Sequence, residues 1–458
     1  MMKVLQITYY YPPMGGAGVQ RGLKFSKYLG EYGVRPIVLC AYDPHYIQDL
    51  SLVDEVPADL QVHRVEHTPL VVRLAARRRK SAPPRKSSTQ AAPGLRGKFR
   101  DAVLAAWNTL HYPDDKIGWA RGALREARQI IRSEELRGEP IDLIFTSSPP
   151  ASAHWIGDRL ARQFDLPWVA DFRDLWTDNP AYSTSRWRRA IDRHVEQEWL
   201  DRATGVVTVT PSWERLLTLR RQSHSPSVFI PNGYDEDDFA GRVPAAPQAD
   251  VFTLVHTGTF YGTRDPSVLF NGLTRYLMNP EPSGPRLRVR LVGSMGGRFQ
   301  AAAREFEGRH PGVLELFDYL PHAQALGELM AADALLLVVG SGRGAGVAGW
   351  LPGKIFEYLR AGKPILMLGA PDGDAANLVR RYGSGWIVDA EDAESLANSL
   401  RSMLQGSSTP TDASAIESSR CFERRELSRQ MAEYMRACVS SHRSHSAPRR
   451  HLRTQVDV

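Results

Sequence analysis

The chain has 458 residues, of which 42% are hydrophobic, and a formal net charge of +7. This length suits two domains of about 200 residues each better than one. The three cysteines, Cys40, Cys421 and Cys438, lack the spacing of a metal site, which favours a reduced compartment. No apolar run of about 18 residues occurs, so we expect no membrane span. Because Met1 to Thr8 lead directly into a strand-like run, we also expect no signal peptide and a cytoplasmic protein.

The positive charge is concentrated in two segments. Residues 73–100 contain ten Lys or Arg residues and no acid, and the C-terminal tail carries further arginines. Such segments are solvated and are attracted to anionic surfaces. Two interpretations stay open: a solubilising loop, or peripheral contact with an anionic membrane worth roughly 1 kcal/mol per basic residue. Nucleic acid is not an expected partner, because no recognition motif or aromatic stacking pattern accompanies the charge.

The first half of the chain has the strand, loop and helix order of a parallel α/β domain. A strand over residues 3–8 ends in a loop that contains Gly15 and Gly16, and a helical pattern follows. Ligands bind beyond the carboxyl ends of such strands, so these glycines would let a phosphate or sugar approach the backbone. The dinucleotide fingerprint lacks its last glycine at Arg21, which makes a nicotinamide site an unfavoured interpretation.

A second candidate site follows the buried strand predicted over residues 167–170. Asp171, Arg173 and Asp174 stand at the carboxyl end of this strand, where a parallel sheet presents its active site. We expect a functional carboxylate at Asp171. For Arg173 and Asp174 two roles stay open, either orienting an acceptor or forming an ion pair that holds the loop.

The second half repeats the α/β pattern. A strand that ends at Gly258 leads to Arg264, whose guanidinium could bind two phosphate oxygens, with helix capping or a surface position as the alternative. The acidic run Asp235 to Asp238 has the alternating carboxylates of a hard-cation site. We reject a metal there, because the run opens a linker rich in Pro and Ala that has no strand to fix its geometry.

The most informative stretch runs from Trp350 to Gly369. Pro352 suits the first turn of a helix, and Gly362 ends that helix before an apolar strand. The open amides at such a helix start, near Leu351 and Gly353, can hold a phosphate. Glu357 lies about one turn further in, within reach of what that phosphate carries. A nucleotide sugar fits this arrangement, whereas a packed helix with a solvated Glu357 is the alternative.

In combination, these features resemble a retaining family 4 glycosyltransferase of the GT-B type. The resemblance rests on the two α/β halves, the glycine loop, the turn Pro231-Asn232-Gly233 and the stretch Leu351–Gly369. Within that family, Ser147–Pro150 and Asp171–Asp174 look most like bacterial transferases that build surface polysaccharides.

The resemblance implies an α/β fold of two Rossmann-like domains that face each other across a cleft. We assign residues 1–236 to an N-terminal acceptor-binding domain with a mobile basic insertion at about 73–100. Residues 237–250 form the linker, and residues 251–405 form the domain that binds the nucleotide sugar. Residues 406–438 would contain a helix that crosses back to the first domain, followed by a disordered basic tail over 439–458.

The resemblance also implies donor-binding residues. Glu357 matches the second glutamate of the family's pair and would bind the ribose hydroxyls, with a share in catalysis. Arg264 stands where a basic residue holds the diphosphate, Lys354 would assist it, and Gly15 with Gly16 would lie over the same group. No metal and no cofactor are implied beyond the nucleotide sugar as substrate.

Two departures from the family pattern bear on catalysis. Gly349 stands where the first glutamate of the pair would be, and Asp171 stands where many members carry a histidine. The expected function is a hexosyl-type transfer from a nucleoside-diphosphate sugar to a glycan or polyprenyl-linked acceptor. Alternatives are a scaffold or binding protein with weakened catalysis, and a sugar-nucleotide epimerase of similar shape.

Overall fold

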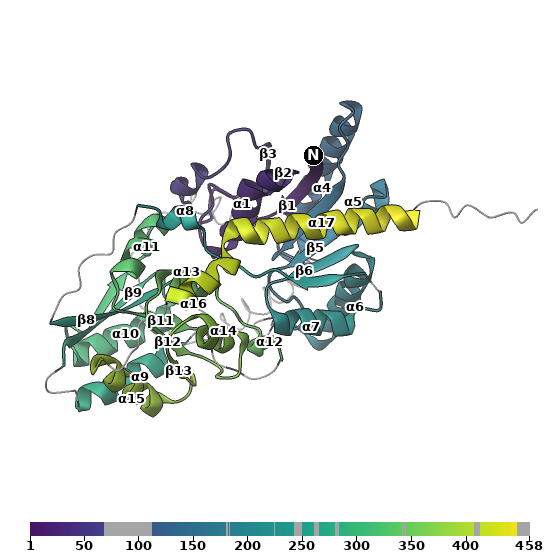
Figure 1. Cartoon of the computed structure of the whole chain (residues 1–458). Coiled ribbons are helices and arrows are strands. Elements are labelled where there is room, and N and C mark those ends of the chain that lie inside the picture. The colour runs from purple at the N-terminus through teal and green to yellow at the C-terminus, as the bar shows by residue number, and fades with distance from the viewer. Residues whose placement is uncertain are drawn as a thin grey trace, which may run out of the picture.

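The computed structural model describes residues 1–67, 112–179, 182, 184–223, 225–241, 250–260, 265–279, 284–340, 342, 345–406 and 413–446. The basic segment 73–100 and Arg264 therefore lie outside the described residues. Two α/β lobes lie side by side, and a long C-terminal helix runs from their boundary along one of them (Figure 1).

The first domain is built on a parallel sheet of seven strands in the order β3-β2-β1-β4-β5-β6-β7. The strands are β1 (Met2–Thr8), β2 (Val34–Tyr42), β3 (Val62–Glu66), β4 (Leu143–Ser148), β5 (Trp168–Phe172), β6 (Gly205–Thr208) and β7 (Ser227–Phe229). The helices are α1 (Ala17–Tyr28), η1 (Leu29–Tyr32), η2 (Leu50–Val53), α4 (Ile117–Leu136), α5 (Ser152–Phe164), α6 (Arg186–Arg202) and α7 (Pro211–Arg220). The strand order reverses between β1 and β4, which makes their carboxyl ends the switch point of this sheet.

The second domain repeats this topology with six parallel strands in the order β10-β9-β8-β11-β12-β13. They are β8 (Val251–Thr257), β9 (Arg286–Val292), β10 (Leu314–Phe317), β11 (Ala334–Val338), β12 (Ile365–Leu368) and β13 (Gly385–Val388). The helices are α8 (Glu236–Phe239), α9 (Ser267–Met278), α10 (Gly297–Arg309), α11 (His322–Ala331), α12 (Ala345–Ala348), α13 (Lys354–Ala361), α14 (Asp374–Tyr382) and α15 (Ala393–Leu404). The predicted pair of Rossmann-like domains is confirmed, and the second switch point lies between β8 and β11.

Both sheets are buried on both faces, which explains their continuous apolar runs. Along β1, Leu5 and Ile7 pack in a core with α4 and α5, whereas Val4 points to the opposite face and packs against the C-terminal helix. This alternation follows from the period of two in a strand. In the second domain, α9, α10 and α15 cover one face, and α11, α13 and α14 cover the other.

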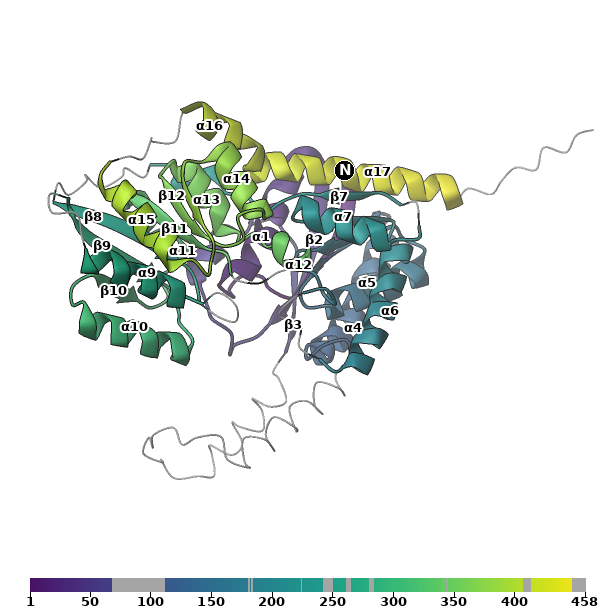
Figure 2. The same ribbon diagram turned by 90° about the horizontal axis from the view of Figure 1, so that it is seen from below.

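The chain returns to the first domain through α16 (Ala413–Ser418), η3 (Ser419–Phe422) and α17 (Arg424–Ser446). The apolar side chains of α17 recur every three or four residues and pack on the first domain, beside Val4 and Phe25; they include Leu427, Met431, Met435 and Cys438. Figures 1 and 2 both show α17 lying along this domain. We expected a disordered tail from residue 439, but the helix continues to Ser446 because Val439 is buried and Arg443 pairs with Asp142. None of the described helices combines the length and apolar character needed to cross a membrane.

Candidate functional site

At the carboxyl ends of β8 and β9, two glycines bring the backbones into direct contact. Gly258 has φ 119° and Gly293 has φ 132°, values that side-chain-bearing residues rarely adopt. The Gly258 amide donates to the Val292 carbonyl at 2.6 Å. A Cβ on Gly293 would lie only 2.6 Å from the Gly258 oxygen. The strand ends therefore present bare backbone just before the segment that contains Arg264.

Lys354, the first residue of α13, places its amine at this turn. Its Nζ lies 3.2 Å from Nε2 of His256, and a Cβ on Gly258 would come within 2.3 Å of that Nζ. His256 Nδ1 lies 2.9 Å from the Leu336 carbonyl oxygen. We assign the proton to Nδ1, which donates to the carbonyl and leaves Nε2 to accept from the ammonium. Lys354 thus places its ammonium beside a neutral imidazole at the switch point of the second sheet.

The start of α13 is the second element of the candidate site. Gly353 is its N-cap residue and makes no side-chain capping hydrogen bond. A Cβ on Gly353 would lie 3.9 Å from the side-chain Nδ2 of Asn232, so α13 begins against the Pro231–Gly233 turn of the first domain. Leu351 packs on the apolar core of the second domain and anchors the approach to the helix. The amides of Ile355 and Phe356 donate to the carbonyls of Pro352 and Gly353 at 3.1 and 3.3 Å, so the expected open amides are largely paired. What remains suited to an anion is the positive end of the helix dipole beside the Lys354 ammonium.

Glu357 lies one turn into α13 and contacts His322 of α11. Its Oε1 is 2.9 Å from His322 Nε2, and the other ring nitrogen is 3.9 Å from Asp238. Burial alone would lower the pKa of His322, but the hydrogen bond and charge of Glu357, with Asp238, raise it to about 9. At neutral pH His322 is therefore a cation that pairs with Glu357. The Glu357 side chain remains 23% exposed, so it can still meet a ligand.

Gly349, where the family resemblance implies a glutamate, faces the first domain. A Cβ at this position would lie 2.3 Å from the indole of Trp213 and 3.0 Å from Oγ1 of Thr210. Thr210 caps α7, and the Trp213 indole N–H donates to the Gly346 carbonyl at 3.0 Å. The indole occupies the space that a side chain at position 349 would need. The glycine is therefore required by the contact between the domains in this arrangement.

Asp171 is fully buried at the end of β5. Its carboxylate accepts from Arg21 at 2.8 and 2.9 Å and from the Ser147 hydroxyl at 2.7 Å. Arg21 also donates to the Pro231 carbonyl at 2.9 Å. The ion pair thus connects α1, β4, β5 and the turn that closes the first domain. This geometry favours a structural role for Asp171 over the catalytic one that we expected.

Arg173 and Asp174 differ in their exposure. Arg173 is buried and donates to the carbonyls of Gly18 and Pro149, so it connects the first turn of α1 with the loop that follows β4. Asp174 is exposed. Of the two roles left open, loop support fits Arg173.

Gly15 and Gly16 lie where the first domain meets the second. A Cβ on Gly15 would lie 2.9 Å from Oη of Tyr319 and 3.0 Å from Cβ of Asp49. The Tyr319 hydroxyl donates to Asp49 at 2.9 Å, which joins the two domains beside the glycines. Gly16 has φ 86° and begins α1. The glycine loop therefore lies against the second domain, as a loop covering a ligand at its strand ends would.

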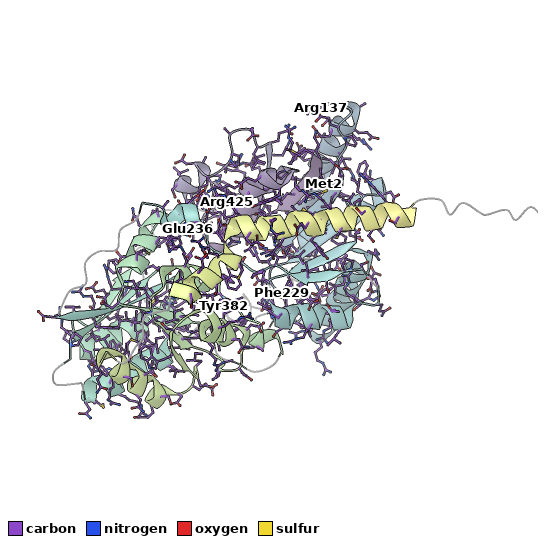
Figure 3. All side chains as sticks on the ribbon, viewed as in Figure 1. Met2, Arg137, Phe229, Glu236, Tyr382 and Arg425 are labelled. Atoms are coloured by element: carbon purple, nitrogen blue, oxygen red, sulfur yellow. The ribbon has the colours of Figure 1, made fainter. Side chains whose placement is uncertain are left out.

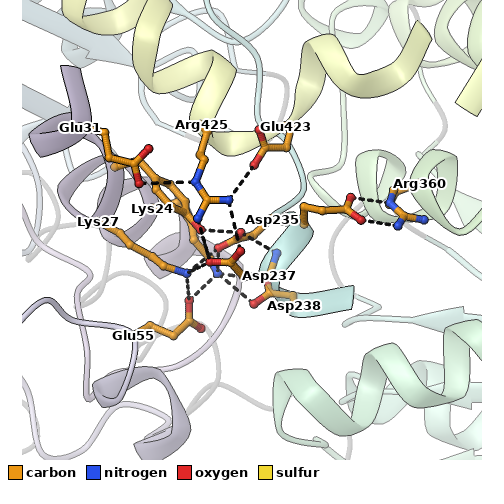
Figure 4. A network of polar contacts seen from close by, with 12 residues as sticks. Lys24, Lys27, Glu31, Glu55, Asp235, Asp237, Asp238, Arg360, Glu423 and Arg425 are labelled. Carbon is orange, nitrogen blue, oxygen red and sulfur yellow. Dashed lines mark hydrogen bonds and ion pairs between the residues drawn. The ribbon is translucent and has the colours of Figure 1, made fainter. Parts of the chain in front are cut away.

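The acidic run Asp235–Asp238 forms an ion network with the first domain (Figure 4). Lys24 contacts Asp235 at 2.6 Å and Asp238 at 3.0 Å, and it also contacts Glu55. Burial would raise the pKa of Asp235, but Lys24 and its neighbours hold that pKa well below its usual range. Within the described residues, Glu55, Asp238 and His322 have ligand atoms close enough for a metal, but the Lys24 ammonium already contacts both carboxylates. Figure 3 places Glu236 and Arg425 at the same boundary.

A cavity of about 390 Å³ lies at the carboxyl ends of β11, β12 and β13. Among the described residues, its lining includes three acids and is made up of Gly340, Gly342, Val347, Ala348, Gly369, Ala370, Pro371, Asp372, Asp389, Ala390 and Glu391. Neither Lys354 nor Glu357 lines it. We base the site on the cationic strand ends rather than on this cavity, because the charged residues of the cavity's described lining are all acids, which do not suit a diphosphate.

Four residues of this region were not singled out from the sequence as site residues: His256, His322, Arg21 and Trp213. His256 interrupts an apolar strand one residue before its carboxyl end, which is a usable signal. The other three acquire their meaning only from partners far away in the chain. Arg21 and Asp171, for example, are 150 residues apart.

Residues 29–233 match the family model described as Glycosyl transferase 4-like domain. This match spans most of the first domain, and a comparison of the sequence with curated proteins finds no match. The family match assigns a glycosyl transferase 4-like domain to residues 29–233.

Solved structures share the two-domain architecture. Sucrose-phosphate synthase from Thermosynechococcus elongatus is 16% identical, with 96% of this chain and 100% of that chain covered and a TM-score of 0.65. Anabaena HepE in complex with UDP is 14% identical, with 95% and 100% covered and a TM-score of 0.62. A putative UDP-N-acetylglucosamine 2-epimerase from Listeria monocytogenes is 11% identical, with 97% of each chain covered and a TM-score of 0.52. These likenesses establish the GT-B fold, and with the domain match they support a glycosyltransferase.

Proposed function

We propose that the protein transfers a hexose-type sugar from a nucleoside-diphosphate sugar to a glycan or lipid-linked glycan, with retention, in cell-surface polysaccharide synthesis. The observation that carries this proposal is the glycosyl transferase 4-like match over residues 29–233. Two further likenesses agree with it: HepE is described in complex with UDP and with UDP-glucose. A galactosyltransferase of the lipopolysaccharide outer core also shares the fold, with a TM-score of 0.53.

In the proposed reaction, the second domain stabilises the charge that develops on the leaving nucleoside diphosphate. The Lys354 ammonium and the positive dipole end of α13 would supply positive charge at the strand ends, and Arg264 follows in the adjoining segment. Preorganised donors of this kind lower the barrier because they need no rearrangement as charge develops. Glu357 would accept from the ribose hydroxyls. The nucleotide sugar is substrate, and the proposal includes no metal and no cofactor.

In the first domain, the Gly15-Gly16 loop would cover the diphosphate and the acceptor would approach beyond β4 and β5. Asp171 would position this edge through Arg21 without touching the substrate. Retention of the anomeric configuration requires the acceptor hydroxyl to attack the sugar on the same face from which the leaving group departs. The proposed reaction does not require a side chain at position 349, where the Trp213 indole occupies the space beside Gly349.

The test is sugar transfer from UDP-, GDP- and ADP-sugars to glycan and polyprenyl-linked acceptors. We expect transfer from one donor class, with a large loss in Glu357→Ala and Arg264→Ala. Glu394→Ala is a matched control, because Glu394 is an exposed glutamate of the same domain that pairs with Arg275. Parent-like transfer by both site variants would reject these assignments.

A sugar-nucleotide epimerase is the second candidate, because the Listeria protein shares the fold over 97% of both chains. An epimerase would convert the donor without any acceptor, whereas a transferase would only hydrolyse it slowly. Donor binding without turnover on any acceptor would instead favour the scaffold alternative that Gly349 motivates.

We also propose that residues 73–100 attach the protein to an anionic membrane on the cytoplasmic side, where a lipid-linked acceptor would lie. Their deletion should weaken sedimentation with anionic vesicles, and added salt should weaken it for the parent. Equal sedimentation of the deleted and parent proteins would reject this proposal.

A further inference from the structure

Arg424, the first residue of the crossover helix α17, is a buried guanidinium at the boundary between the domains. The residue is 5% exposed, and its amide donates to the Tyr234 carbonyl at 2.9 Å. Figure 4 shows its two neighbours, Glu423 and Arg425, where the chain passes from η3 into α17. The helix thus begins with a cation directed inward at this boundary and a second one, Arg425, that is 38% exposed.

Nη1 of Arg424 is buried and has no hydrogen-bond partner within the part of the chain that the structure describes. The nearly equally buried Arg21 differs, because its guanidinium holds Asp171 through two nitrogens. Leaving a buried charge without a partner costs several kcal/mol. A buried guanidinium whose Nη1 donates to no partner is therefore a candidate binding group for an anion.

The three acids that act on the charge of Arg424, namely Asp235, Asp238 and Glu357, are already paired with other cations. Asp235 and Asp238 accept from Lys24 at 2.6 and 3.0 Å, and Glu357 pairs with His322 at 2.9 Å. Burial and then the charge of Arg21 lower the pKa of Arg424 to about 10, although Glu357, Asp235 and Asp238 act in the opposite direction. The group is still charged at neutral pH, but its surroundings do not fully compensate it.

The segment around Arg424 also reaches the start of α13. A Cβ on Gly233 would lie 2.0 Å from the Phe422 carbonyl oxygen, so the Pro231–Gly233 turn packs directly on the chain that enters α17. The same turn places Asn232 beside Gly353. Arg424 is therefore near the helix start that we assign to the donor phosphate, but it comes from a different element.

We propose that Arg424 binds a phosphate group of a substrate at the domain boundary. This inference rests on the proposed function and adds to it a residue from the crossover helix. A guanidinium is suited to this task because it can donate two parallel hydrogen bonds to phosphate oxygens. The phosphate comes either from the diphosphate of the donor or from a phosphate on the acceptor.

The first measurement is thermal unfolding of the parent, Arg424→Gln, Arg424→Lys and the control Arg429→Gln. Arg429 lies on the exposed side of the same helix and pairs with Glu426 and Glu433. Without ligand, Arg424→Gln should melt no lower than the parent, because it removes an uncompensated charge. A substantially lower melting temperature, or failure to fold, would contradict the inference, because it would give the guanidinium a structural role.

The second measurement is binding of inorganic pyrophosphate to the same proteins. We expect binding to be about tenfold weaker in Arg424→Gln, in line with the loss of a charged hydrogen bond. Arg424→Lys should recover part of it, and Arg429→Gln should match the parent. Absence of pyrophosphate binding in the parent, or equal binding by Arg424→Gln, would overturn the inference.

A competition experiment separates the two sources of phosphate. A nucleoside diphosphate that displaces the Arg424-dependent pyrophosphate assigns the residue to the donor, and binding of both together assigns it to the acceptor. The two proposals also fail separately. If Arg424→Gln binds pyrophosphate like the parent while Lys354→Ala loses sugar transfer, only the inference on Arg424 is lost.

Discussion

The two switch points of this protein carry the same topology but opposite electrostatic arrangements. In the first domain, Arg21 and Asp171 are both fully buried and satisfy each other. In the second domain, the Lys354 ammonium lies 3.2 Å from Nε2 of His256, beside the glycine turn of β8. A buried ion pair that satisfies both of its charges stabilises the fold, whereas a cation at the strand ends can stabilise a bound anion. We therefore propose a structural role for the first switch point and anion binding for the second.

The largest expected effect is on the first switch point. Asp171→Ala would leave Arg21 as an unpaired buried cation, so we expect the free energy of unfolding to fall by about 3–5 kcal/mol. Urea denaturation would measure this loss, with the exposed Asp174→Ala as control. Replacing both partners, as in Arg21→Met with Asp171→Leu, should recover part of the loss. A loss below 1 kcal/mol in Asp171→Ala would mean that the pair is not structural.

The matching change at the second switch point should act on activity instead. Lys354→Ala removes the cation at the strand ends, and we expect about a 100-fold slower transfer with little change in unfolding free energy. Steady-state kinetics and urea denaturation of the same samples would separate the two effects. Lys363→Ala, just beyond the C-terminal end of α13, is the control. If Lys354→Ala lost stability but kept its transfer rate, Lys354 would have a structural role, and the proposed difference between the two switch points would be wrong.

The contact between Gly349 of the second domain and Trp213 of the first predicts an intermediate effect on the free energy of unfolding. Gly349→Ala would press a methyl group against Trp213, and overpacking of this kind costs about 1–3 kcal/mol. In a Trp213→Ala background the same substitution should cost much less. Unfolding free energies of the four proteins in this double-mutant cycle provide the test. Equal costs in both backgrounds would show that Gly349 and Trp213 do not meet in solution.

The smallest expected effect is a pH dependence from His322. Its pKa is raised from 6.5 to about 9 by Glu357 and Asp238, against the effect of burial. Because the folded-state pKa is the higher one, this contribution to stability is complete below pH 6.5 and is lost as the pH rises through about 9. The parent should therefore lose more unfolding free energy than His322→Gln between about pH 6 and pH 10. Parallel losses in the two proteins would exclude a charged His322.

Much of the fold follows from local sequence signals. Pro352 and Gly362 predict the limits of α13, and Gly362 indeed ends the helix with φ 65°. The glycines that end two predicted strands, Gly258 and Gly293, likewise lie where the backbones of the two strand ends are in contact. The predicted C-terminal end of α17 was wrong. Val439 is buried in the core of the first domain, and the helix continues beyond the residues that its sequence pattern indicated.

The roles of site residues were harder to predict, because charge pairing is decided by partners far apart in the chain. Asp171 stands at the end of a parallel strand, which predicts a functional carboxylate, but Arg21 neutralises and buries it. Glu357 and His322 meet between α13 and α11 without any local signal. The position of Lys354 at the start of α13 follows from the local helix signals, whereas its role in donor binding stays a prediction.

Titration calorimetry with UDP, GDP and ADP would test the central claim most directly. The proteins to compare are the parent, Lys354→Ala and Asp171→Asn. We expect one nucleotide to bind the parent, to bind folded Asp171→Asn with the same affinity, and to bind Lys354→Ala about tenfold or more weakly. Parent-like affinity in Lys354→Ala, or loss of binding in Asp171→Asn that remains folded, would contradict the assignment of the nucleotide to the second switch point.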